Sequence, residues 1–136
     1  MPKRPRREPA WVDRLVVDAV HLDQLREHGG LPGLRDENVL ESALARAKNR
    51  WHYEAGVDLG TLAAAYGWAL TTSHPYRDGN KRVAFLTMAI FLGLNGRELD
   101  APEPEVVQVM LAVAAGRCSE REFAAWVSAH LTRSPR

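Results

Sequence analysis

The stretch NKRVAFLTMAIFLGL, residues 80–94, is apolar around nearly its whole circumference when it is drawn as a helix. A helix with this pattern is buried on all sides in a soluble protein, and Asn95–Gly96 supplies residues at which helices commonly end. The run is too short to cross a bilayer, whose hydrocarbon core is about 30 Å thick. We therefore expect a central buried helix around which the rest of the chain packs.

Outside this stretch, five segments have apolar residues at helical spacing. Their expected ranges are 11–29, 36–48, 58–74, 103–115 and a last helix that begins with the capping box at 119–122. Asp36 or Asn38 can cap the second of these helices, and Asp58 the third, which must stop before Pro75. In the first helix, the spacing predicts an inward stripe of Leu15, Ala19, Leu22 and Leu25.

The fold class is therefore all-α, with about six helices around a central hydrophobic one. No stretch alternates as a half-buried strand would, and no internal repeat is present. A chain of 136 residues is ordinary for one domain. We place this single domain at residues 11–136, and we expect the basic, proline-containing residues 1–10 to form a disordered arm.

Charge and cysteine content exclude several classes of protein. The net charge of +1 provides no overall field toward nucleic acid or an anionic membrane. A single cysteine, Cys118, excludes an internal disulfide, and the first residues lack the apolar run of a secretory signal. We expect a cytoplasmic protein with no membrane association.

HPYRDGNKR, residues 74–82, joins the third helix to the first turn of the central one. The first N–H groups of a helix lack partners within it and lie at the positive end of its dipole, so they bind anions such as phosphate. Lys81 and Arg82 add positive charge there, and Asp78 offers a hard oxygen ligand for Mg²⁺. His74 could accept a proton from an attacking hydroxyl. The combination suggests phosphoryl or nucleotidyl transfer.

The same nine residues are also good turn chemistry, and an ordinary turn is the alternative interpretation. The glycine spacing does not fit the G-x-x-x-x-G-K-S/T phosphate loop. The other four histidines show no metal-ligand spacing, so we expect no structural metal. These are His21, His28, His52 and His130.

The motif closely resembles the H-x-F-x-D/A-G/A-N-K-R signature of the Doc (death-on-curing) branch of the Fic family. The resemblance extends to GGLPGLRD (29–36), LESALAR (40–46) and FLGLNG (91–96), in the same order. It implies a Fic fold of packed helices. It also implies a toxin that phosphorylates a threonine of elongation factor Tu with ATP, until a Phd-type antitoxin neutralises it.

Carried over residue by residue, the resemblance assigns a role to each position of the motif. His74 would be the catalytic base, Asp78 the Mg²⁺ ligand, and the backbone at Gly79 and Asn80 the cradle for the phosphates of ATP. Lys81 and Arg82 would hold those phosphates.

Two alternatives remain open at this point. Fic adenylyltransferases have H-P-F-x-D/E-G-N-G-R-x-x-R, from which Lys81 and Phe85 depart in the direction of Doc, whereas Gly79 leans toward the wider family. Tyr76 in place of the usual phenylalanine is a mild departure. The other alternative is a non-catalytic module that binds a nucleotide or a peptide, which the joint presence of His74, Asp78, Asn80 and Arg82 disfavours.

The resemblance also concerns partners. The segment 50–57 is where Fic proteins carry a flap that aligns the target, so Trp51, His52 and Tyr53 are possible target contacts, with an ordinary irregular loop as the alternative. No window matches the S/T-x-x-x-E-G/N helix by which many Fic proteins inhibit themselves. We therefore expect an antitoxin, acting in trans near the motif, and no direct DNA binding without it.

Overall fold

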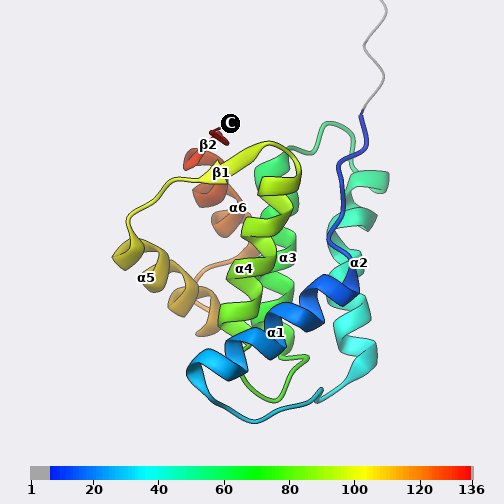
Figure 1. The fold of residues 1–136 in the computed structure, drawn as a ribbon. Coiled ribbons are helices and arrows are strands. Elements are labelled where there is room, and N and C mark those ends of the chain that lie inside the picture. Colours follow the sequence, from blue (N-terminus) through cyan, green and yellow to red (C-terminus); the bar gives the residue numbers. More distant parts are fainter. Residues whose placement is uncertain (1–6, 136) are drawn as a thin grey trace, which may run out of the picture.

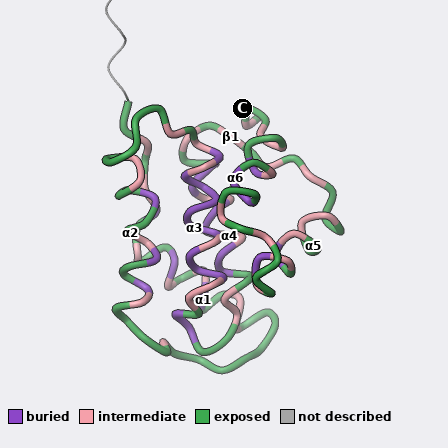
Figure 2. The backbone as a smooth tube through the Cα atoms, turned by 180° about the vertical axis from the view of Figure 1, so that it is seen from behind, coloured by how far each residue is buried: buried purple, intermediate pink, exposed green. Residues whose placement is uncertain are grey.

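Two helices at the centre of the molecule, α3 (Leu59–Ser73) and α4 (Asn80–Leu94), lie side by side and carry much of the core (Figure 1). The computed structural model describes residues 7–135. Figure 2 shows the buried positions concentrated along α3 and α4. Tyr66 and Phe91 are both buried, and their ring centroids lie 5.2 Å apart. The prediction of a buried helix at residues 80–94 is confirmed.

Four further helices surround this pair: α1 (Arg14–His28), α2 (Glu37–Tyr53), α5 (Glu103–Ala114) and α6 (Glu120–Ala129). α2 and α6 pack against α3, whereas α1 packs against α4. The residues that the structure describes thus contain six helices, the number that the sequence predicted. The all-α prediction is confirmed.

Local capping explains where most helices begin. Asp13, Asp36, Asp58 and Ser119 each accept a hydrogen bond from the backbone of the first turn that follows, and Ser119 completes a capping box with Glu122. Of the two cap candidates for α2, the structure has Asp36. These start signals are local, so the sequence alone could locate them.

The predicted inward stripe of α1 was wrong. Leu15 and Leu22 are 77% and 50% exposed, and the buried residues of this helix are Val17 and His21. α1 rests on α4 along a face that also meets the loop at residues 74–79, and that loop is polar. A histidine is therefore buried where the spacing of leucines predicted an apolar contact.

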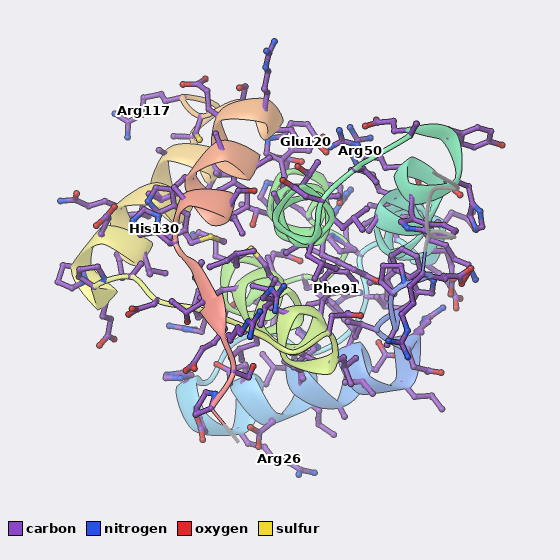
Figure 3. All side chains as sticks on the ribbon, turned by 90° about the horizontal axis from the view of Figure 1, so that it is seen from above. Arg26, Arg50, Phe91, Arg117, Glu120 and His130 are labelled. Atoms are coloured by element: carbon purple, nitrogen blue, oxygen red, sulfur yellow. The ribbon has the colours of Figure 1, made fainter. Side chains whose placement is uncertain are left out.

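The predicted end of the second helix at residue 48 was wrong, because α2 continues through Tyr53 and takes in the first part of the segment 50–57. Arg50 stabilises this extra turn by pairing with Glu54 at 2.9 Å, and it also pairs with Glu120 of α6 at 3.0 Å. Figure 3 shows Arg50 and Glu120 next to each other between α2 and α6. The contact with α6 comes from far along the chain, so local periodicity did not reveal it.

A small antiparallel sheet was not predicted. β1 (Arg97–Leu99) pairs with β2 (Leu131–Arg133), with Glu98 opposite Thr132. Strands of three residues are too short to show a period, and the pairing links segments more than thirty residues apart in sequence. The sheet ties the chain after α4 to the C-terminal segment.

The N-terminal segment that the structure describes joins the domain just before Trp11. Ala10 donates its N–H to the side chain of Asn95 at 2.9 Å, and the Asn95 amide donates back to the Ala10 carbonyl at 2.9 Å. Residues 1–6 of the predicted arm lie outside the described residues. Within residues 7–135, no helix is both long enough and apolar enough to span a membrane.

Candidate active site

The motif loop, residues 74–79, connects α3 to α4 and lies beside a second loop, residues 29–36, which follows α1. Both loops run along the same end of the molecule (Figure 1). The Arg35 N–H donates to the Pro75 carbonyl at 2.8 Å, and the Arg77 N–H donates to the Gly33 carbonyl at 3.1 Å. The sequence suggested only a turn at residues 29–36, and tertiary structure places that turn against the motif loop.

The N-terminus of α4 is open for a ligand. Its N-cap residue is Gly79, at φ 78°, and no side chain caps the helix there. By helix geometry, the N–H groups of Asn80, Lys81 and Arg82 have no acceptor within the helix. The terminus is therefore suited to hold an anion.

The side chain of Asn80 fixes the loop instead of facing a ligand. Its Oδ1 accepts from the Tyr76 N–H at 3.0 Å, and its Nδ2 donates to the Tyr76 carbonyl at 2.9 Å. Both ends of the amide are thus occupied. Only the backbone N–H of Asn80 is left for the cradle role that the sequence predicts.

The charged side chains of the motif converge on one pocket of about 390 Å³. Its lining comprises His74, Arg77, Asp78, Gly79, Asn80, Lys81 and Arg82. Within residues 7–135, the side chains of His74, Lys81 and Arg82 have no hydrogen-bond or ion-pair partner. Two cations without counter-ions beside an open helix N-terminus form a strongly anion-attracting site.

His74 occupies a strained backbone position. It ends α3 in the left-handed region, at φ 50° and ψ 59°, and among the described residues it is the only one other than glycine with positive φ. Such conformations persist where surrounding structure enforces them, and they are common at active sites. Here Arg35 supplies that structure, because its Nε donates to the His74 carbonyl at 2.7 Å.

The carboxylate of Asp78 is held by backbone N–H groups from both loops. Leu31 donates to Oδ2 at 3.2 Å, and Gly79 donates to Oδ1 at 3.0 Å. Gly30, at φ 125°, lies so close that an added Cβ would be 2.9 Å from Oδ2. The glycine is therefore required at this position both for its backbone conformation and for the approach of the carboxylate.

Asp78 fits Mg²⁺ as a single protein ligand. Two N–H groups use about half of the lone-pair directions of a carboxylate, which leaves room for a cation. Residues 7–135 contain no cluster of three or more potential metal-binding side chains. Mg²⁺ commonly binds through one or two carboxylates together with the phosphates of a substrate, so a lone Asp78 beside a phosphate site is consistent with that cation.

A longer groove adjoins the pocket. It has a volume of about 640 Å³ and runs between α1, α4 and α5. Val106, Val107, Met110 and Leu111 provide apolar walls, and Lys81 and Arg82 line the groove as well as the pocket. Anything seated in the groove would therefore reach the two cations of the motif.

The predicted target contacts Trp51, His52 and Tyr53 lie away from the motif. Trp51 packs against Trp11 and lines a hollow with Leu94 and Asn95, at the C-terminal end of α4. The motif is at the other end of this 15-residue helix, about 22 Å away at 1.5 Å per residue. The structure does not bring these three residues to the motif, whereas residues 29–36 contact the motif loop through Leu31, Gly33 and Arg35.

Comparison with known proteins gives two matches. The family model described as "Fic/DOC family" matches residues 11–92, which is more than half of the chain and includes the whole motif. The chain is also 33% identical over 101 residues to "Protein kinase doc" of Escherichia phage P1, an alignment that covers 74% of this chain and 79% of that protein. Both matches confirm the resemblance recognised in the sequence.

Proposed function

We propose that this chain, which belongs to the Fic/DOC family, is a toxin that transfers the γ-phosphate of ATP to a serine or threonine hydroxyl of a translation factor. Elongation factor Tu is the target that we propose, with arrest of translation in the cytoplasm as the consequence. The observation that carries the proposal is the convergence of His74, Asp78, Lys81 and Arg82 on one pocket at an open helix N-terminus.

Each of these residues has a distinct task in the proposed reaction. The imidazole of His74 accepts the proton of the target hydroxyl while the hydroxyl oxygen forms a bond to the γ-phosphorus. The bond between that phosphorus and the β–γ bridging oxygen breaks, and ADP leaves. The N–H groups of the first turn of α4, with Lys81 and Arg82, stabilise the charge on the phosphates. Mg²⁺ held by Asp78 would neutralise further charge on the phosphate oxygens.

Lys81 favours transfer of the γ-phosphate over transfer of AMP. A long cation stands where adenylyltransferases of the family have a small residue, and its ammonium has no partner among residues 7–135. One turn later the chain has Phe85, which lines the apolar groove, in place of a second arginine. With the cationic charge concentrated at the first turn, we propose that the γ-phosphate is presented to His74.

The groove between α1, α4 and α5 supports inhibition by a partner. We propose that a Phd-type antitoxin places an amphipathic segment there, with apolar residues against Val107 and Leu111 and an acidic residue toward Arg82. Val107 is 51% and Leu111 49% exposed, which leaves a hydrophobic surface for such a segment. Since Lys81 and Arg82 line both hollows, a bound segment would compete with the phosphates.

For the segment that aligns the target, the structure favours residues 29–36 over the predicted residues 50–57. Leu34 already forms an isolated antiparallel bridge with Tyr76 of the motif loop, and Leu31 is 64% exposed. A loop that already forms one antiparallel bridge can also pair its backbone with a target strand. We propose that the target strand lies along this loop, next to His74.

The test is a pair of labelling reactions. Purified protein, elongation factor Tu and Mg²⁺ are incubated with ATP labelled at the γ-phosphate in one tube and at the α-phosphate in the other, with His74→Ala as control. Transfer of the γ label, lost in His74→Ala, supports the proposal. Transfer of the α label identifies an adenylyltransferase instead. Label in neither tube, followed by labelling of another protein in a cell lysate, overturns the choice of target.

A further inference from the structure

A histidine outside the motif, His21 of α1, is buried against the motif loop. Only 6% of its surface is exposed, and its ring stacks on that of Tyr76 with centroids 3.8 Å apart and planes 15° from parallel. Its neighbours on α1, such as Leu22, face solvent. A polar ring is thus buried on a helix that leaves Leu15 and Leu22 exposed, and a buried polar ring needs a hydrogen-bond partner.

The partner is the backbone of Asp78. The Nε2 atom of His21 lies 3.0 Å from the Asp78 carbonyl oxygen. A carbonyl only accepts, so Nε2 must carry the hydrogen. Asp78 immediately precedes Gly79, which takes the left-handed conformation from which α4 starts. The hydrogen bond therefore holds the loop at the point where the proposed Mg²⁺ ligand meets the proposed phosphate cradle.

A second connection from α1 reaches the same loop. The Tyr76 hydroxyl donates to Asp18 at 2.8 Å, and Asp18 in turn pairs with Arg14 at 3.4 Å. Tyr76 is 3% exposed. Asp18 and His21 lie three residues apart, hence on one face of the helix. One face of α1 thus contacts the motif loop at three points: the Tyr76 hydroxyl, the Tyr76 ring and the Asp78 carbonyl.

We propose that His21 is a positioning residue of the active site, which aims the Asp78 carboxylate and the first-turn N–H groups of α4 at the phosphates by holding the Asp78 carbonyl. The proposal rests on the proposed function for its catalytic consequence, but the positioning itself can be measured without turnover. His21 does not line the motif pocket, so it acts through Asp78 and Gly79 and not by contact with the substrate.

The test uses two substitutions that separate the ring from the donor. His21→Phe keeps a ring to stack on Tyr76 and loses the N–H, whereas His21→Gln keeps a donor and loses the ring. Leu22→Phe and Leu22→Gln are the matched controls at the neighbouring exposed position. NMR hydrogen exchange is measured at the amides of Arg77 and Val83, which bond within or next to the loop, and at Val127 of α6 as a remote reference.

We expect His21→Phe to speed exchange at Arg77 and Val83, with Val127 unchanged, and to reduce both Mg·ATP affinity and kcat about five- to tenfold, the effect of one hydrogen bond. His21→Gln should recover most of the loss. Exchange and kcat within twofold of wild type in His21→Phe would overturn the proposal. So would uniformly faster exchange, Val127 included, without rescue by glutamine, because that result describes a residue needed only for folding.

The outcomes also distinguish this inference from the proposed function. If the wild-type protein transfers no phosphate while His21→Phe still loosens Arg77 and Val83 locally, the positioning stands and the phosphotransferase assignment fails. If transfer occurs and the His21 variants behave like the Leu22 controls, the assignment stands and the positioning fails.

Discussion

The guanidinium of Arg35 holds the end of α3 at the residue we propose as catalytic base: its Nε donates to the His74 carbonyl at 2.7 Å, and its Nη2 donates to the Ser73 carbonyl at 2.8 Å. These carbonyls belong to the last turn of a helix, where acceptors lack partners within the helix. His74 has the left-handed backbone conformation, which costs a residue other than glycine about 1–2 kcal/mol. The planar arginine fork therefore stabilises a strained backbone from a neighbouring loop.

Arg35→Leu should lower kcat about tenfold while reducing the free energy of unfolding by only about 1 kcal/mol, because two exposed hydrogen bonds are lost and water can replace them. Phosphate transfer and urea unfolding would be measured on the same preparation. Arg26→Leu is the control, since Arg26 is exposed and points away from the helices in Figure 3. Activity of Arg35→Leu equal to that of Arg26→Leu would show that His74 needs no such support.

His74→Gly should make the protein more stable and inactive. Glycine adopts positive φ without the penalty of about 1–2 kcal/mol that His74 carries. Glycine also gives the unfolded chain more entropy, which offsets about 0.4–1 kcal/mol of this gain, so we expect a net rise of about 1 kcal/mol or less in the free energy of unfolding. Loss of the base should reduce transfer by about 10²–10⁴. Chemical denaturation and γ-label transfer provide the two readouts, and His74→Ala supplies a comparison that is inactive without the gain. A less stable His74→Gly would contradict the view that the backbone is strained here.

Lys81→Ala should weaken ATP binding and transfer. Hydrogen bonds to charged groups contribute about 1.5–3 kcal/mol, so we expect kcat/KM for ATP to fall about 10- to 100-fold. Lys48→Ala is matched to it, since Lys48 is an exposed lysine of α2 with no role in the site. Both α- and γ-labelled ATP would be supplied. An unchanged kcat/KM would place the phosphates out of reach of this side chain.

Tyr76→Phe should change the response of stability to high pH. Burial, and to a smaller extent the hydrogen bond to Asp18, raises the pKa of Tyr76 well above its ordinary value of 10.0. The folded protein therefore holds this proton more tightly than the unfolded chain. The stabilisation is complete below pH 10, and it is lost above that pH by up to about 1.4 kcal/mol per unit.

Urea unfolding of the wild type and of Tyr76→Phe at several values above and below pH 10 would test this dependence. Burial also raises the pKa of Tyr66, whose effect is present in both proteins and cancels in the difference. Tyr53→Phe, at a residue 87% exposed, is the control and should follow the wild type. Parallel curves for the wild type and Tyr76→Phe would mean that Tyr76 ionises as readily in the folded protein as in the unfolded chain.

Much of the site was predictable because its signals are contiguous. The order of His74, Asp78, Gly79 and Lys81 specifies a turn into a helix N-terminus, and Pro75 prevents α3 from continuing. The fold rests on equally local signals: caps such as Asp58, the capping box at Ser119, and the apolar run of α4. Each depends on residues within a few positions of one another, so a single sequence carries it.

Other features were decided only by contacts between distant segments. Arg50 of the extra turn of α2 pairs with Glu120, which lies 70 positions later in the sequence. β1 forms because β2 pairs with it. His21 is buried, and Leu15 is not, because α1 crosses α4 where the motif loop presents a carbonyl. The sequence by itself determined where helices start and stop and which residues form the motif, since those depend on backbone neighbours. Tertiary structure decided which face of α1 is buried and which loop borders His74, because these depend on packing between helices that no local pattern encodes.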